Sequence, residues 1–144
     1  MGEGHAVRVT TRTEAGRAAI EATGAECWIG TPERLATLRA ALESVTIVCW
    51  LLGTAAGEGE ALRALHASRL EFFLGQVIDT TVRGFVYEAA GTVPSEALTE
   101  GERIVQALGE RNVIPVAVLG ADPLDTGVWL DAAHAEIDVL LLGR

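Results

Sequence analysis

Short apolar segments alternate with longer amphipathic segments along the chain. The short segments are rich in Val, Ile and Leu, and they predict strands at residues 7–11, 26–30, 46–52, 85–89 and 113–120. Apolar residues at helical spacing predict helices at residues 14–22, 31–45, 59–82, 95–111 and 126–142. Strands separated by helices of this length pair in parallel, so the pattern predicts an α/β domain with helices on both faces of its sheet.

A few residues are expected to mark the ends of these elements. Gly24 should stop the first helix, and Thr31 should cap the second, with Pro32 in its first turn. Ser95 should cap the fourth helix. Pro115 cannot donate a hydrogen bond to a neighbouring strand, so it favours an edge position for the last strand.

Composition and charge narrow the chemistry that the chain can perform. Its 144 residues are expected to form one domain, residues 1–144. The net charge of −9 comes from 20 acidic and 11 basic residues without a basic patch, so nucleic acid and anionic membranes are poor partners. All the bases are arginine. Chemistry that needs a lysine, such as a Schiff base or a Tyr/Lys proton relay, is therefore excluded.

The cysteines and the apolar stretches point to a cytoplasmic protein. Cys27 and Cys49 both lie in apolar runs, which is typical of buried, reduced thiols. The chain starts without the basic and apolar regions of a signal peptide. No apolar stretch reaches the roughly 20 residues of a bilayer span.

Three passages resemble a known family. They are GHAVRVTTRT (4–13), GAECWIGTPERLATLRAAL (24–42) and SVTIVCWLLG (44–53). Together they resemble the second strand, the following passage and the fourth strand of NAD(P)-binding Rossmann domains in the atypical short-chain dehydrogenase, NmrA-like and epimerase branch. The resemblance implies a Rossmann-like parallel sheet of about five strands and an NAD(P)-binding type of domain.

The sequence departs from this family in its signature motifs. It has no first strand with a G-x-x-G-x-x-G turn to hold the pyrophosphate, and Gly2 and Gly4 do not supply that motif. Thr31 stands where the family has Asp, and the Tyr-x-x-x-Lys pair is absent. We therefore expect an amino-terminally incomplete domain, which is either naturally shortened or has its true start upstream.

The resemblance implies a cofactor contact after the strand at 7–11. Arg12 occupies the place of the arginine that pairs with the adenosine 2′-phosphate, which implies NADP rather than NAD, and Thr11 and Thr13 flank it with hydroxyls. A solvated arginine at a strand end is the alternative. Gly53 and Thr54 follow the strand at 46–52, where the cofactor passes in the family, and a flexible loop is the alternative there.

Candidates for catalysis are few. Tyr87 could line the ligand crevice or donate a proton, but without a lysine partner its pKa is expected near its usual value of about 10. His66 is expected at the surface. His134 has no metal-ligand spacing around it, and no metal site is predicted.

These observations favour a Rossmann-like NAD(P)-binding-type domain without catalysis in this form. NADP binding is expected to be weak, because the glycine-rich loop is missing. An NADP-dependent reductase or epimerase-family oxidoreductase with an upstream start is one alternative. A self-associating interaction domain, forming a homodimer, is the other. With the first strand absent, we expect residues 7–11 to pair directly with residues 46–52. The substrate stays open.

Overall fold

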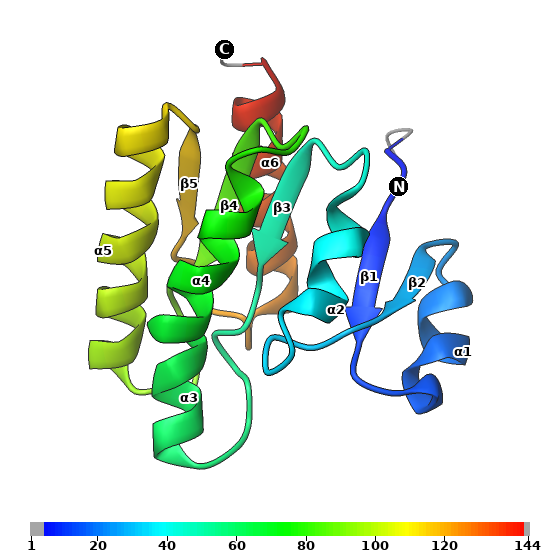
Figure 1. The fold of residues 1–144 in the computed structure, drawn as a ribbon. Helices are drawn as coiled ribbons and strands as arrows, with labels where there is room; N and C mark the ends of the chain where they lie inside the picture. Colours follow the sequence, from blue (N-terminus) through cyan, green and yellow to red (C-terminus); the bar gives the residue numbers. More distant parts are fainter. Residues whose placement is uncertain (1–4, 143–144) are drawn as a thin grey trace. The chain divides into compact units, whose positions relative to one another are not determined.

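A computed structural model of the protein describes residues 5–142, which divide into two compact units (Figure 1). The first unit ends at Glu43 and the second begins at Ser44. Each unit has its own parallel sheet. Gly2 and Gly4 lie outside the described residues, and the prediction of one domain over residues 1–144 stays a prediction.

The first unit is built around one strand–helix–strand repeat. Its elements are β1 (Arg8–Thr11), η1 (Glu14–Gly16), α1 (Arg17–Glu21), β2 (Glu26–Ile29), α2 (Ala36–Arg39) and η2 (Ala40–Leu42). β1 and β2 pair in parallel, with Arg8 opposite Glu26 and Thr11 opposite Ile29. Gly24 has a φ of 91°, and its N–H donates to the carbonyl of Glu21, so it stops α1 as predicted.

The predicted cap of the second helix is wrong. Helix α2 begins at Ala36, five residues after Thr31. The Thr31 hydroxyl donates instead to the Glu33 carboxylate, at 2.6 Å, and Thr31 and Arg34 form an isolated bridge. Because the hydroxyl is engaged with a side chain two residues away, residues 31–35 form turns before the helix starts.

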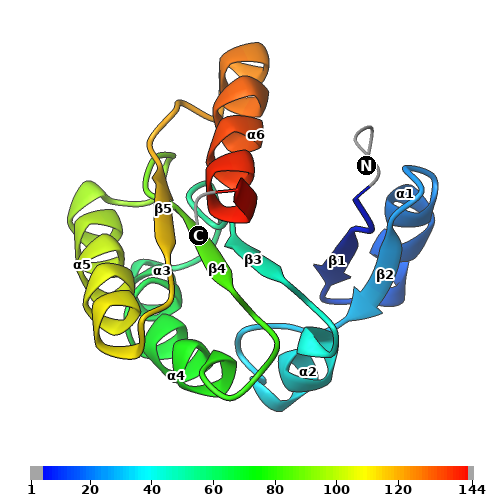
Figure 2. The ribbon, with the colours of Figure 1, turned by 90° about the horizontal axis from the view of Figure 1, so that it is seen from above.

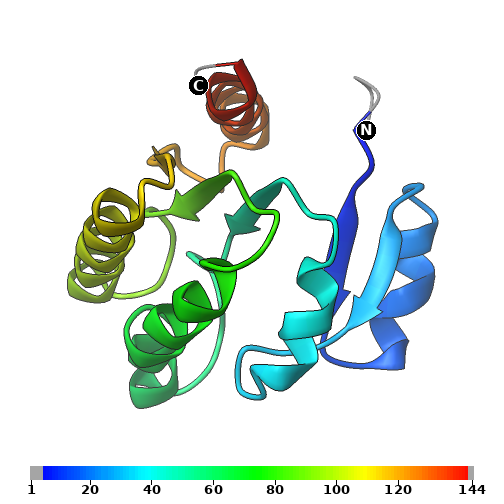
Figure 3. The ribbon, with the colours of Figure 1, turned by 45° about the horizontal axis from the view of Figure 1, so that its top comes forward.

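The second unit is a three-layered α/β structure. Its elements are β3 (Ile47–Trp50), α3 (Gly59–Leu65), α4 (Ser68–Val77), β4 (Gly84–Glu88), α5 (Ser95–Asn112), β5 (Val116–Leu119) and α6 (Thr126–Leu142). The parallel strands have the order β3-β4-β5. Figure 2 shows α4 and α5 on one face of this sheet and α6 on the other, and Figure 3 shows the same layers from a second angle.

The core of this unit is apolar on both faces of β4, and all five residues of that strand are buried. Toward α4, Phe73 lies between Trp50 and Phe85, with ring centroids 5.0 and 6.5 Å away. Toward α6, Val86 and Leu119 pack in one cluster with the helix. β5 lies at the edge of the sheet directly after Pro115, as predicted.

The single helix predicted over residues 59–82 is broken into two. α3 ends at Leu65 and α4 starts at Ser68, because His66 and Ala67 leave the helical conformation. His66 is fully buried, so its prediction as a surface residue is also wrong. Its side chain forms hydrogen bonds with Tyr87 of β4 and with the Leu52 carbonyl, and the helix is interrupted at this residue.

The described residues contain five parallel strands, which confirms the predicted Rossmann-like α/β class, but they form sheets of two and three strands. β1 pairs with β2 alone, and β3 with β4 alone, among the described strands. The predicted direct pairing of residues 7–11 with 46–52 is therefore wrong. Each of β1 and β3 forms backbone hydrogen bonds along one edge, with the strand that follows it in sequence, and neither pairs with a described strand along its other edge.

The two cysteines are both free thiols, but only one is buried. Cys27 lies in β2 and is buried as predicted. Cys49 lies in β3 and is exposed, so the prediction of burial is wrong for this residue. Side chains alternate between the two faces of a strand, so Cys49 stands on the same face as Ile47, and the described cluster with α6 on that face includes Ile47 but not Cys49.

Within residues 5–142, no helix combines the length and the apolar character that a membrane crossing requires.

Candidate functional site

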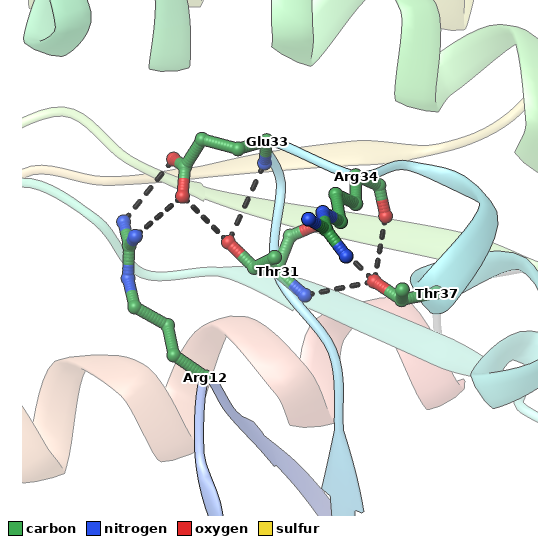
Figure 4. A network of polar contacts seen from close by, with 5 residues as sticks. All are labelled: Arg12, Thr31, Glu33, Arg34 and Thr37. Carbon is green, nitrogen blue, oxygen red and sulfur yellow. Dashed lines mark hydrogen bonds and ion pairs between the residues drawn. The ribbon is translucent and has the colours of Figure 1, made fainter.

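Arg12 follows β1 directly and forms an ion pair with Glu33 (Figure 4). Two contacts join the guanidinium and the carboxylate: Nη1 to Oε1 at 2.5 Å and Nη2 to Oε2 at 3.1 Å. Both side chains are accessible, with 63% of Arg12 and 42% of Glu33 exposed. Parallel two-point contact is the geometry that arginine also uses to bind phosphate.

The carboxylate of Glu33 is oriented by the turn in which it lies. The Thr31 hydroxyl donates to Oε1 at 2.6 Å and accepts from the Glu33 N–H at 3.4 Å. The Thr31 N–H in turn donates to the Thr37 hydroxyl oxygen at 2.9 Å, and Figure 4 shows these contacts leading to the start of α2. The turn therefore presents an acceptor to Arg12 from a fixed position.

The threonines on either side of Arg12 differ in their surroundings. Thr11 lies at the end of β1, and its carbonyl accepts from the Gly30 N–H at 2.9 Å. A Cβ placed on Gly16 would overlap the Thr11 hydroxyl, so this hydroxyl lies against η1. Thr13 is exposed and precedes η1. Of the three predicted contacts, Arg12 and Thr13 are the accessible ones.

Gly53 and Thr54 lie in the second unit, after the carboxyl end of β3. The Gly53 N–H donates to Glu88 Oε1 at 2.9 Å, and its carbonyl accepts from the Val93 N–H at 3.0 Å. A Cβ on Gly53 would overlap the carbonyl of Ala90. Gly53 therefore allows the loop after β3 to approach the loop after β4 closely. Thr54 is exposed.

Glu88, the neighbour of Tyr87 at the end of β4, is a buried carboxylate to which no role was assigned from the sequence. Only 2% of the residue is exposed. Its Oε1 accepts from Gly53, and its Oε2 accepts from Trp129 Nε1 at 2.7 Å. The carboxylate thus accepts from the segment after β3 and from α6, and it ties both to the end of β4. An acidic residue within the apolar run 84–90 is the signal that could have identified it.

Tyr87 is fully buried rather than open to a crevice. Its hydroxyl lies 2.6 Å from His66 Nδ1, and His66 Nε2 lies 3.0 Å from the Leu52 carbonyl oxygen. Burial raises the pKa of Tyr87 well above its ordinary value, which corrects the expectation of an unshifted pKa. Burial also lowers the pKa of His66. The pair forms a closed polar cluster within the core.

The predicted site residues are divided between the two units. Thr11, Arg12 and Thr13 belong to the first unit, and Gly53, Thr54 and Tyr87 belong to the second. Two polar residues that shape these groups, Glu33 and Glu88, received no site role from the sequence, and a third, His66, was expected at the surface. Glu33 could have been found as the acid two residues after Thr31, in the passage that follows β2.

Comparison with known proteins gives structural likeness alone. No family model matches the sequence, and no curated protein sequence matches it. The crystal structure of gox2253 superposes with a TM-score of 0.66 at 18% identity, over 81% of this chain and 44% of that chain. The triphenylmethane reductase of Citrobacter sp. complexed with NADP(H) gives 0.59 at 14% identity, over 78% of this chain and 38% of that chain.

A second structure of the Citrobacter reductase gives the same TM-score of 0.59 at 16% identity, with the same coverage. The chain spans less than half the length of each of these structures. At such identities the likeness establishes the fold. The chain has a Rossmann-like fold, which is the fold that the sequence resemblance implied.

Proposed function

We propose that this protein is a domain of the NAD(P)-binding type in which Arg12 contacts the 2′-phosphate of NADP. The observation that carries the proposal is the two-point ion pair between Arg12 and Glu33 at the carboxyl end of β1. A phosphate and a carboxylate offer the same pair of acceptors to a guanidinium, so a 2′-phosphate can replace Glu33 on Arg12. The Rossmann-like fold supports the proposal, because ligands of such parallel sheets bind at the carboxyl ends of the strands, and Arg12 follows the carboxyl end of β1.

Binding is proposed to be weak for two reasons. Glu33 competes with the phosphate for Arg12, and its negative charge repels the incoming anion. The sequence also holds no G-x-x-G-x-x-G turn to bind the pyrophosphate. The proposal assigns no catalytic role to Tyr87, because its hydroxyl is buried against His66 and the chain has no lysine to pair with it.

A second candidate is a part of an NADP-dependent oxidoreductase. The observation that favours it is the fold likeness to the Citrobacter reductase complexed with NADP(H), of which this chain spans 38%. This candidate predicts that the protein oxidises NADPH in the presence of a reducible substrate, measured by the loss of the nicotinamide absorbance. The first candidate predicts binding without that oxidation.

The proposal is tested by titrating the protein with 2′,5′-ADP and with 5′-AMP, followed by amide chemical shifts. We expect 2′,5′-ADP to bind more tightly, with the largest shifts at residues 11–13 and 31–33. Arg12→Gln should remove this preference, which corresponds to about tenfold for one charge-assisted contact. Glu33→Gln should strengthen 2′,5′-ADP binding by severalfold, since exposed ion pairs contribute about 1 kcal/mol or less.

Glu14→Gln is the matched control for Glu33→Gln. Glu14 forms the same kind of exposed pair with Arg17 in the same unit, with contacts of 2.7 and 2.9 Å. The control changes the net charge equally and should leave 2′,5′-ADP binding close to that of the unmodified protein. Equal gains in the two variants would assign the effect to net charge and contradict a specific role of Arg12.

A further inference from the structure

β3 pairs with β4 along one edge, and no described strand lies along its other edge. The Thr46 carbonyl accepts from the Arg83 N–H at 2.7 Å, on the side of β4. Backbone groups alternate between the two edges of a strand, so every second residue from Thr46 onward directs its N–H and C=O groups to β4. The intervening residues direct theirs to the open edge, and they are Ile47 and Cys49 of β3 and the following Leu51.

This open segment is bounded on both sides by residues whose backbone groups have partners. Before it, the Val45 carbonyl accepts from the Thr81 hydroxyl at 2.7 Å. After it, the Gly53 N–H donates to a carboxylate and the Gly53 carbonyl accepts from a backbone N–H. The open backbone groups on this edge of the described strand therefore span residues 47–51, with Cys49 at the centre.

The segment lacks the features that usually prevent edge strands from pairing. Natural edge strands carry charged side chains, proline or bulges that discourage the approach of another strand. Residues 44–57 contain neither a charged residue nor a proline. The chain therefore has an unprotected edge in a protein whose net charge is otherwise −9.

The side chains at this edge are apolar on both faces of the sheet. Ile47, Cys49 and Leu51 share one face, because side chains alternate along a strand. Ile47 packs in the cluster with α6 on that face, whereas Cys49 and Leu51 are exposed. On the opposite face, Trp50 packs against Phe73 of α4. A strand added to this edge would therefore cover apolar side chains as well as bond to the open backbone groups.

The segment is complementary to itself. If two copies meet as antiparallel strands about a two-fold axis at Cys49, that residue lies opposite its own copy, and Ile47 lies opposite Leu51. Each of these opposed residues directs its backbone groups to the open edge, so each pair can exchange two hydrogen bonds. Further along, Glu43 falls opposite Ala55 of the second copy. Apolar residues thus face apolar residues, and this acidic residue does not face another acid.

We propose that the open edge of β3 is a dimerisation surface, on which residues 47–51 of two copies pair antiparallel about a two-fold axis at Cys49. The two three-stranded sheets then form one continuous sheet, with α6 of both copies on the same face. A second copy is the occupant, because the uncharged segment matches itself at each opposed position. This surface lies in the second unit and does not depend on the proposed cofactor contact of Arg12 in the first unit.

The test compares Cys49→Lys, Cys49→Glu and their equimolar mixture in the full chain, with the molar mass measured by light scattering over a range of concentrations. Each variant alone places two like charges against one another at the axis and should weaken the dimer by about tenfold or more. The mixture places an ammonium opposite a carboxylate and should restore the association. Because the two substitutions change the net charge in opposite directions, a shared effect of net charge cannot weaken both.

Phe72→Lys and Phe72→Glu are the matched controls. Phe72 lies in α4 of the same unit and is 67% exposed, so the controls make the same changes at an exposed apolar residue away from β3. Both should associate like the unmodified protein. Loss of association in these controls as well would overturn the assignment to β3.

The remaining outcomes are equally decisive. A mass that stays monomeric in the unmodified protein at every concentration overturns the proposal and leaves the edge to a strand of a different polypeptide. Association that survives in both Cys49 variants overturns the role of β3. Loss in both variants without recovery in the mixture overturns the two-fold axis at Cys49.

A measurement without charged variants decides the case if either of them fails to fold. Opposed residues that exchange hydrogen bonds have Cα atoms about 5.5 Å apart, so a short bismaleimide should join Cys49 of the two copies. Cys27 is buried, and Cys27→Ser should keep this cross-link, whereas Cys49→Ser should lose it. Mass spectrometry of the digested product identifies the joined residues. No link between the two Cys49 residues at concentrations where the protein is dimeric would overturn the proposal.

Discussion

Gly101 of α5 and Tyr87 of β4 show how the size of one residue is fitted to the position of another in a different element. Gly101 is buried in α5, and a Cβ placed there would overlap the Tyr87 hydroxyl and lie 3.1 Å from the His66 carbonyl oxygen. The glycine thus leaves room for a hydroxyl that has to reach His66. Glycine lowers the stability of a helix by about 1 kcal/mol relative to alanine, and at this position it leaves the space that the Tyr87 hydroxyl occupies.

Gly101→Ala should therefore destabilise the protein, by about 1–3 kcal/mol, since overlap in a packed core exceeds the gain in helix propensity. Gly75→Ala is the control: Gly75 lies inside α4, and nothing is within 4 Å of a Cβ placed there. This control should stabilise the protein by about 0.5–1 kcal/mol. Urea denaturation of both variants measures the difference. A stabilised Gly101→Ala variant would contradict the packing of Tyr87 against α5.

At the scale of elements, the end of α5 carries backbone strain. Val113 follows the helix with φ 56° and ψ 43°, and its N–H donates to carbonyls of the last turn. A left-handed residue in this position is usually glycine, because a β-branched side chain clashes with its own backbone there. The Val113 side chain is 87% exposed, so little packing compensates for the strain.

Val113→Gly is expected to stabilise the protein by about 1 kcal/mol, because glycine adopts this conformation without the clash. The comparison variant is Val113→Ala, which removes the branching but keeps the Cβ and should give a smaller gain. Thermal denaturation of the three proteins gives the order. A loss of stability in Val113→Gly would mean that the exposed side chain makes a contact that outweighs the strain.

Most elements could be predicted from the sequence, because the spacing of their apolar residues indicates which face of the element is buried. α5 is an example: its buried residues Ala97, Leu98, Ile104 and Val105 repeat at helical spacing. The break between α3 and α4 could not be predicted in this way. It depends on hydrogen bonds from His66 to Leu52 and Tyr87, which are remote in sequence.

The candidate site shows the same limit. Arg12 could be identified from the strand that precedes it, and the structure places it at the end of β1. Its partner Glu33 follows a second strand and reaches Arg12 only after the chain has returned in parallel. Likewise, Thr31 does not cap α2, because its hydroxyl donates to the Glu33 carboxylate. Such a side-chain bond competes with capping, and helix propensity does not predict it.

At the scale of the whole molecule, α6 is apolar on more than its buried face. Ala133 and Leu140 are buried beside the sheet, whereas four large apolar side chains of the same helix are exposed. They are Val128 (55%), Leu130 (47%), Val139 (61%) and Leu142 (83%). Exposed apolar surface of this kind favours association, and it supports the proposal that the protein forms a homodimer.

We expect the molar mass from light scattering to rise with protein concentration, and Val139→Glu to reduce that rise, because a buried charge opposes association. Val113→Glu adds the same charge at an exposed apolar residue outside α6 and should leave the association unchanged. A mass that stays monomeric at every concentration would contradict the proposal. Equal effects of the two variants would assign the association to net charge rather than to α6.

The most direct measurement of the central proposal is a calorimetric titration of NADP⁺ and NAD⁺ into the unmodified protein and into Glu33→Gln. We expect dissociation constants of about millimolar or weaker for both cofactors with the unmodified protein, because Glu33 occupies Arg12 and no glycine-rich turn binds the pyrophosphate. In Glu33→Gln, NADP⁺ should bind severalfold more tightly than NAD⁺. A micromolar dissociation constant for the unmodified protein, or equal affinities for the two cofactors in Glu33→Gln, would contradict the proposed role of Arg12.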